Sequence, residues 1–210
     1  MVILVHGLLA GPRSMRCLAD HLSQHQFGVT TWRYRTMRQP IARHANRLRQ
    51  QLEMLAGEAS IDKIHFVTHS LGGLVVRVAL QKPLRKLGRV VMLAPPNGGS
   101  HLTRIPLGPF QWLFPPLVEM HESPDSFVNQ LPIPQDVEIG ILAAADDKIV
   151  RVDSTHLACQ KDHRILKGGH IQLPQQAEAC REVVQFLRTG YFRKQAEAPR
   201  NFTRGRTWAA

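Results

Sequence analysis

The sequence predicts an α/β fold: a three-layer sandwich in which a mostly parallel sheet is covered by helices on both faces. Two observations predict it. Short aliphatic runs alternate along the chain with longer segments whose apolar residues recur at helical spacing, which is the pattern of βαβ units. The 210 residues are also enough for one domain with a complete core, and few for two.

Strands are expected at the short apolar runs. Residues 2–5 form a continuous aliphatic run, which suits a strand that is buried on both faces of a parallel sheet. The other expected strands are residues 28–32, 63–67, 89–94, 137–144 and 163–166. The expected helices, where apolar residues recur with the period of a helix, are residues 13–25, 41–55, 72–82 and 174–187.

Two segments interrupt this alternation. Residues 95–135 are rich in proline and aromatic residues and indicate an excursion between two strands, either a lid-like or pocket-lining segment or a packed surface loop. Residues 191–210 carry an excess of basic side chains, which indicates a flexible C-terminal tail. The expected organisation is therefore one α/β domain over residues 1–190, followed by the tail.

The chain is strongly basic, with a net charge of +11 and a pI near 10.4. Much of the excess lies between Arg188 and Arg206, where Glu197 is the single acidic residue. A solvated tail is the simpler interpretation, and weak contact with an anionic membrane surface is the alternative. No base-reading motif accompanies the charge, so nucleic acid is not expected as a partner.

The remaining composition indicates neither a disulfide framework nor a cofactor. The 3 cysteines are scattered, and each is interpreted as a small buried hydrophobic residue. His21 and His25 share a helix face but lack a third ligand, so no metal is expected. Neither a signal peptide nor a membrane span is recognised, which makes a cytoplasmic protein the expectation unless the natural N-terminus is longer.

A candidate nucleophile lies in Thr68-His69-Ser70-Leu71-Gly72-Gly73. The segment follows an expected strand and precedes an expected helix, which is the context of a G-x-S-x-G nucleophile elbow. The tight turn requires small residues near the serine, and Gly72 and Gly73 provide them on one side. Thr68 occupies the position where glycine is commonest. A serine that only caps the helix is the alternative, but capping would not require the preceding buried strand.

Acyl transfer places negative charge on a substrate oxygen, and fixed backbone N–H groups must stabilise it. The amide of Leu71, directly after Ser70, is one expected oxyanion-hole donor. The second is expected in the loop after the first strand, which begins His6-Gly7-Leu8, and the amide of Leu8 is the best candidate.

These segments resemble bacterial lipases and esterases of the α/β-hydrolase superfamily. The resemblance rests on residues 5–8, residues 68–73 and residues 94–100, and extends over residues 2–188. It implies a minimal form of the fold with about six strands, without the first two strands or a large cap.

In this superfamily the acid and the histidine of the catalytic triad follow the serine in that order. Asp146 and Asp147 both follow the expected strand 137–144, and Asp147 is favoured because Asp147-Lys148-Ile149-Val150 resembles the D-x-x-V pattern of lipases. Asp146 is then interpreted as a turn residue.

For the base, His170 is favoured because it follows Gly168 and Gly169 on a loop just after an expected strand. His163 would lie at the wrong end of that strand, and His156, nearer the acid loop, is the other competitor.

The expected function is hydrolysis of carboxylic esters or lipids through an acyl-enzyme on Ser70, with His170 as the base and Asp147 as its orienting acid. An acyltransferase or a thioesterase would use the same triad. A catalytically silent binding protein with this fold is the alternative from another class.

Overall fold

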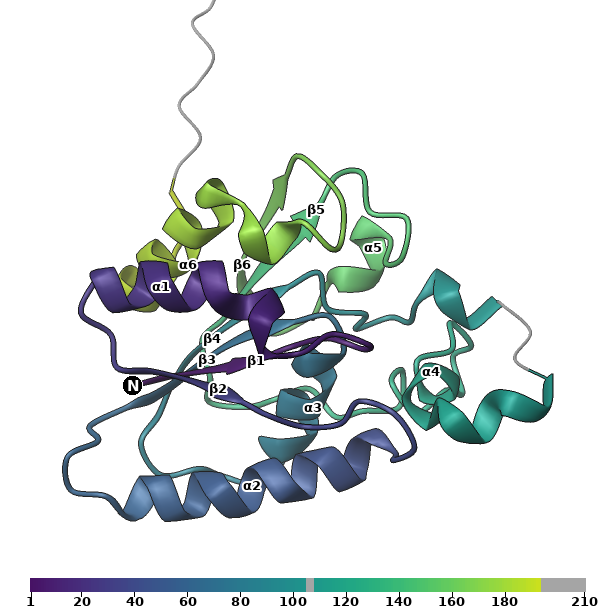
Figure 1. Cartoon of the computed structure of the whole chain (residues 1–210), viewed down its shortest axis with the longest axis horizontal. Coiled ribbons are helices and arrows are strands. Elements are labelled where there is room, and N and C mark those ends of the chain that lie inside the picture. Colours follow the sequence, from purple (N-terminus) through teal and green to yellow (C-terminus); the bar gives the residue numbers. More distant parts are fainter. Residues whose placement is uncertain (105–107, 194–210) are drawn as a thin grey trace, which may run out of the picture.

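The computed structural model describes residues 1–104 and 108–193. Its centre is a six-stranded, all-parallel sheet with the strand order β2-β1-β3-β4-β5-β6. Helices cover both faces of this sheet (Figure 1). The expected three-layer α/β sandwich is therefore confirmed.

The strands form where the aliphatic runs predicted them. Their bounds are β1 Val2–Val5, β2 Val29–Trp32, β3 Ile64–His69, β4 Leu87–Leu93, β5 Ile139–Ala144 and β6 Gln160–Leu166. Since all of them run in the same direction, their carboxyl ends meet at one edge of the sheet, and the loops that leave this edge carry the candidate site residues.

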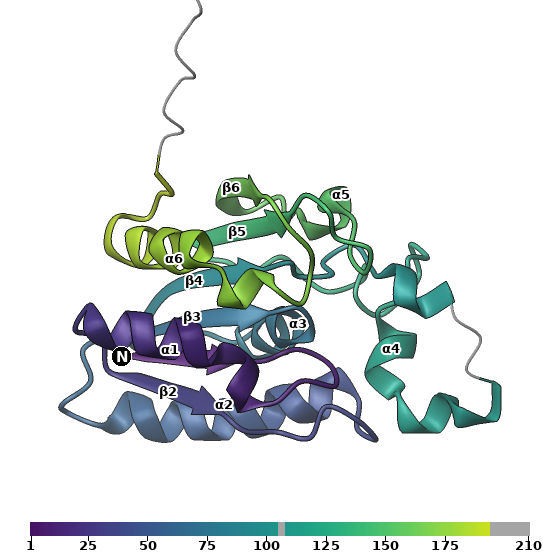
Figure 2. The same ribbon diagram turned by 45° about the horizontal axis from the view of Figure 1, so that its top comes forward.

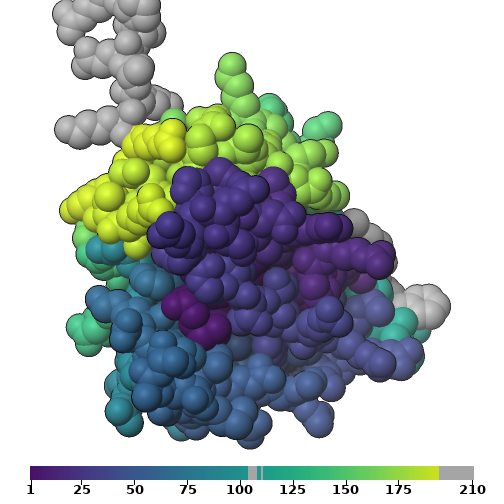
Figure 3. All heavy atoms as spheres, turned by 60° about the vertical axis from the view of Figure 1, so that its left-hand side comes forward, coloured from purple at the N-terminus to yellow at the C-terminus, as the bar shows by residue number. Residues whose placement is uncertain are grey.

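Four main helices pack on the sheet. They are α1 Arg16–Gln24, which follows the 3-10 turn Pro12–Met15, then α2 Ile41–Gly57, α3 Leu71–Ala79 and α6 Ala177–Thr189. Helices α1 and α6 lie on one face and α2 and α3 on the other (Figures 1 and 2). Figure 3, from the side of Met1, shows α1 directly against α6.

Each face of the sheet has its own core. One cluster joins the buried side of α2 and α3 to the sheet, with Leu48, Leu52 and Phe66 fully or almost fully buried. The other joins α1 and α6 to the opposite face, with Leu18, Val183 and Phe186 at its centre. Two such cores account for the near-continuous hydrophobic character of the central strands.

Two parts of the C-terminal half differ from the sequence expectation. Strand β6 begins at Gln160 rather than at residue 163 and includes Lys161 and Asp162, because an edge strand pairs on one side only and tolerates polar side chains. The short helix α5, Val152–Thr155, was not predicted, because four residues are too few to show a helical hydrophobic period.

The excursion 95–135 contains short helical turns, His101–Arg104 and Gly108–Leu113, and the helix α4, Pro115–Glu119. Leu117, Met120 and Val128 join the core cluster on the α2 side, so part of the excursion packs as a surface layer of the domain.

Packing against the domain is described as far as Arg193, whose amide donates to Glu182. Phe192 is buried against Phe186, and its amide donates to Asp162. The rest of the expected tail, residues 194–210, lies outside the described residues. No helix among the described residues is long and apolar enough to cross a membrane.

The cysteines differ from one another. Cys180 is buried as expected, Cys159 is partly buried, but Cys17 is exposed, so its interpretation as a buried residue was wrong. The sulfur of Cys17 on α1 lies 3.5 Å from that of Cys180 on α6.

Candidate active site

Ser70 lies in a strained backbone conformation between β3 and α3. Its φ of 52° and ψ of −126° are unusual for a residue with a side chain. Two backbone bonds hold the turn: the amide of Ser70 donates to the Leu93 carbonyl on β4, and the amide of Gly73 donates to the Ser70 carbonyl, both at 2.9 Å. The conformation therefore presents one serine at the carboxyl edge of the sheet.

The glycines around Ser70 make room for close backbone packing. A Cβ on Gly72 would lie 2.3 Å from the carbonyl oxygen of Val5, so only glycine lets α3 approach β1 this closely. A Cβ on Gly7 would lie 3.0 Å from the Cβ of Ser70.

Thr68, which stands where glycine is commonest, is accommodated by Gly73. A Cβ on Gly73 would lie 3.3 Å from the Oγ1 of Thr68 and 3.1 Å from Pro95. The threonine therefore fits within the elbow because glycine at 73 leaves the space.

Asp147 and His170 form a buried pair. The Nδ1 of His170 lies 2.7 Å from Oδ2 of Asp147, and both side chains are almost fully buried. The other carboxylate oxygen accepts the amides of Ile149 and Val150, each at 2.8 Å. The carboxylate is thus fixed by its own loop before it orients the imidazole.

The pKa of Asp147 reflects these contacts. Burial acts to raise it, but the hydrogen bond from His170 and those from the amides of Val150 and Ile149 outweigh burial, so the pKa lies below its usual value. Asp147 is therefore ionised at neutral pH, as an acid that stabilises an imidazolium must be.

Ser70 and the Asp147–His170 pair lie at the same edge but are not joined by a hydrogen bond. Within the described residues, none links the Oγ of Ser70 to His170. Hydrogen bonds of this kind often form only once substrate is bound.

His69 links the two parts of the site. Its Nε2 lies 3.0 Å from the His170 carbonyl oxygen, and the two rings pack with centroids 4.8 Å apart. Burial, and then repulsion from His170, lowers the pKa of His69 to about 3, so the ring is neutral and its Nε2–H donates to that carbonyl. The residue before the serine thereby holds the backbone of the expected base.

The loop that carries Leu8 is supported by the segment that follows β2. The hydroxyl of Tyr34 donates to the His6 carbonyl at 2.7 Å, and the amide of Leu9 donates to Oγ1 of Thr36 at 3.0 Å. The ring of Tyr34 also stacks on that of His6, with centroids 4.6 Å apart. These contacts fix the backbone of the loop.

The amides of Leu8 and Leu71 are the two expected oxyanion-hole donors. Among the backbone hydrogen bonds of the described residues, neither of these N–H groups donates to a protein acceptor. Leu71 is the first residue of α3, where an amide has no intrahelical partner and the helix dipole favours negative charge.

The competing candidates have other contacts. Asp146 is exposed, and its backbone and carboxylate bond to Gly168 instead of a histidine. His163 and His156 stack on each other with centroids 3.9 Å apart, and His163 also bonds to Thr155. The structure brings neither histidine to Asp147.

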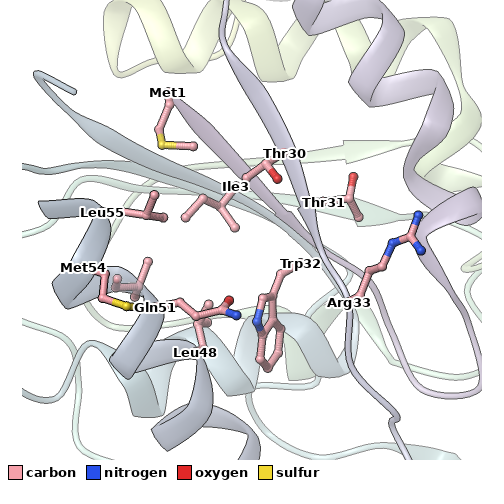
Figure 4. A pocket seen from close by; sticks show the side chains of 11 residues that line it. Met1, Ile3, Thr30, Thr31, Trp32, Arg33, Leu48, Gln51, Met54 and Leu55 are labelled. Atoms are coloured by element: carbon pink, nitrogen blue, oxygen red, sulfur yellow. The ribbon is translucent and has the colours of Figure 1, made fainter. Parts of the chain in front are cut away.

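Two cavities differ in their position relative to the site. One of about 500 Å³ is lined by His170, Ile171 and Lys148 among others, and opens beside the expected base. The other, of about 490 Å³, lies between edge strand β2 and α2 (Figure 4). None of its lining residues is a candidate site residue.

Within residues 1–104 and 108–193, no three or more His, Cys, Asp or Glu side chains are grouped so that they could hold a metal ion. The rings of His21 and His25 lie with centroids 4.7 Å apart, and the amide of His25 donates to the His21 carbonyl.

Sequence reasoning did not identify two supporting residues. Tyr34 and Thr36 follow a strand that was expected, but nothing in a single sequence shows that they reach back to the loop at residues 6–9. The rings of Trp32 and Tyr34, two positions apart in the sequence, stack with centroids 4.5 Å apart.

Comparisons with known proteins bear on the fold and on the first half of the chain. Residues 1–97, which include the Leu8 loop and Ser70, match the family described as "Putative serine esterase (DUF676)". A search of the curated proteins found no match.

Solved structures of lipolytic enzymes share the fold at low sequence identity. The mature lipase BlEst2 of Bacillus licheniformis has a TM-score of 0.73 at 13% identity, covering 90% of this chain and 91% of that one. A monoacylglycerol lipase of Paleococcus ferrophilus has a TM-score of 0.63 at 17% identity, covering 90% and 94%. Phospholipase PlaB of Legionella pneumophila has a TM-score of 0.58 at 20% identity, covering 74% of this chain but 43% of that one.

The expected resemblance is thus confirmed: the chain has the α/β-hydrolase fold, resembles bacterial lipases and esterases, and matches a serine esterase family over its first 97 residues.

Proposed function

We propose that the protein is a serine esterase that cleaves carboxylic or lipid esters through a Ser70–His170–Asp147 triad. The observation that carries the proposal is the buried Asp147–His170 pair at the same sheet edge as the strained Ser70. The match of residues 1–97 to a serine esterase family and the fold shared with lipases support hydrolase chemistry.

In the proposed reaction, the Oγ of Ser70 attacks the ester carbonyl carbon while Nε2 of His170 removes its proton. The amides of Leu8 and Leu71 stabilise the oxyanion. His170 then gives the proton to the alcohol as it leaves, and an acyl-enzyme remains on Ser70. Water, deprotonated by the same histidine, releases the acid and restores the serine.

Asp147 holds the Nδ1–H of His170 in this scheme, which leaves Nε2 as the base and stabilises the imidazolium. The amides that fix the carboxylate prevent it from turning away. The excursion 95–135 is proposed as a wall of the acyl-binding region.

A chain-length series of p-nitrophenyl esters tests the proposal. Wild type should hydrolyse part of the series, while Ser70→Ala should lose at least about a thousandfold in kcat. Ser60→Ala, which removes an exposed serine, is the matched control and should retain full activity. Undiminished hydrolysis by Ser70→Ala would refute the assignment of the nucleophile.

A further inference from the structure

A basic and apolar surface lies beside the candidate active site. It consists of three exposed arginines and three exposed apolar side chains: Arg33, Arg35, Arg38, Leu9, Met37 and Trp112, here called the arginine rim. Leu9 is 69% and Trp112 63% exposed, which is high for large apolar side chains.

The arginine rim is attached to the loop that carries Leu8. Trp32, the last residue of β2, pairs with Val5 at the end of β1, so the chain leaves β2 at the edge that also carries Ser70. The bond from the Leu9 amide to Thr36 then joins the two loops directly. A groove of about 560 Å³ runs between them, lined by Leu9, Ala10 and residues 34–38.

The charges of the rim are available for a ligand. Within the part of the chain that the structure describes, Arg33, Arg35 and Arg38 form no ion pair with an acidic side chain. Arg33 also lines the cavity between β2 and α2, and its guanidinium points away from Met1 and Leu55 at the other end of that cavity (Figure 4).

Trp112 belongs to the same surface although it comes from the excursion. The guanidinium of Arg38 lies 5.7 Å from the centre of its ring, and the amide of Arg38 donates to the Leu113 carbonyl. The rim therefore combines the loop at residue 9, the segment after β2 and the excursion.

The mixture of side chains favours a lipid surface over a nucleic acid as the partner. Arginines attract the phosphates of anionic lipids, and tryptophan and aliphatic side chains favour the boundary between headgroups and acyl chains. A nucleic acid would use the arginines but leave Leu9 and Met37 in water.

We propose that the arginine rim docks the protein on anionic phospholipid membranes, with the arginines on lipid phosphates and Leu9, Met37 and Trp112 at the acyl boundary. Docking would bring the groove beside Leu8 against the lipid surface. The inference rests on the proposed function, because docking would make membrane lipid the source of the ester substrate. Membrane binding itself can be measured independently of hydrolysis.

Vesicle co-sedimentation of the full chain tests the docking. Wild type should bind vesicles of phosphatidylcholine mixed with phosphatidylglycerol much more tightly than phosphatidylcholine alone, and salt should weaken binding. The variant Arg33→Gln/Arg35→Gln/Arg38→Gln should lose about a hundredfold in affinity for the mixed vesicles.

A matched variant controls for net charge. Lys63→Gln/Lys82→Gln/Arg85→Gln removes the same number of positive charges from exposed positions. These positions precede β3 and β4 and so lie at the amino ends of the strands, away from the rim. It keeps residues 194–210 unchanged, as the rim variant does. If it weakens vesicle binding as much as the rim variant, binding follows overall charge and the proposal is overturned.

The apolar part is tested by Trp112→Ala against Met54→Ala, which truncates a side chain 66% exposed on α2. Trp112→Ala should weaken vesicle binding also at high salt, and Met54→Ala should not. Equal binding of wild type to duplex DNA and to mixed vesicles, both unaffected by Trp112→Ala, would overturn the lipid assignment.

Hydrolysis of a soluble short-chain p-nitrophenyl ester separates the two proposals. The arginine variant should retain wild-type kcat/KM on this ester, which also shows that it is folded. Rim-dependent vesicle binding without any esterase activity would refute the proposed function and leave the docking intact. Activity on the soluble ester with no preference for anionic vesicles would refute the docking alone.

Discussion

At the scale of single residues, two adjacent carboxylates have different environments. Asp147 is buried and receives bonds from His170 and two backbone amides, while the exposed Asp146 ties its own loop to Gly168. The sequence favoured Asp147 from a resemblance, but could not show which carboxylate faces inward, because both follow the same strand.

These environments predict different mutational effects. Asp147→Asn should lower kcat for ester hydrolysis by about three to four orders of magnitude, because the amide would favour the wrong tautomer of the histidine. Asp146→Asn should change kcat less than about tenfold. Steady-state kinetics on a soluble ester measures both, and a larger loss for Asp146→Asn would contradict the assignment.

The contact between His69 and the His170 carbonyl predicts a second effect of substitution on kcat. His69→Leu removes the donor to the His170 carbonyl and should lower kcat about tenfold to a hundredfold, because small displacements of a catalytic group are costly. His69→Gln can still present an N–H and should recover part of that loss. Identical kinetics for the Leu variant and wild type would show that the contact does not position His170.

At the scale of elements, the close approach of α3 to β1 decides whether the elbow can form. The strands and main helices were predictable because their apolar periods are strong. The start of β6 was not, since Gln160–Asp162 are polar, nor was α5, which is one turn long. The support from Tyr34 and His69 was also beyond prediction, because it depends on contacts distant in sequence.

Two glycine-to-alanine variants test this packing. In Gly72→Ala the new Cβ would meet the Val5 carbonyl at 2.3 Å, so we expect a loss of unfolding free energy of about 1–3 kcal/mol and lower activity. Gly57→Ala, at the end of α2, meets no atom within 4 Å and should be neutral or stabilising by up to about 1 kcal/mol. Chemical denaturation measures both, and equal effects would contradict the packing argument.

At the scale of the whole molecule, several histidines are neutral in the folded chain, and they make the free energy of unfolding depend on pH. Burial is the main cause that lowers the pKa of His65 and His163 to about 4 and of His69 to about 3. The unfolded chain binds protons at these residues below about pH 6.5, whereas the folded chain does not until lower pH.

The free energy of unfolding should therefore be highest above about pH 6.5 and fall steadily as the pH decreases toward 4. Urea denaturation at a series of pH values measures the slope. His65→Gln should make the slope shallower, while substituting the exposed His121 by glutamine should not. A stability that is flat across this range would contradict the lowered pKa values of these partly or fully buried histidines.

The central claim is that Ser70 is an activated nucleophile, and covalent labelling with a fluorophosphonate probe tests it most directly. The account predicts one probe per chain by intact mass, located on Ser70 by peptide mapping, with labelling lost in Ser70→Ala and retained in Ser60→Ala. Absence of labelling in folded wild type, or labelling that persists in Ser70→Ala, would contradict it.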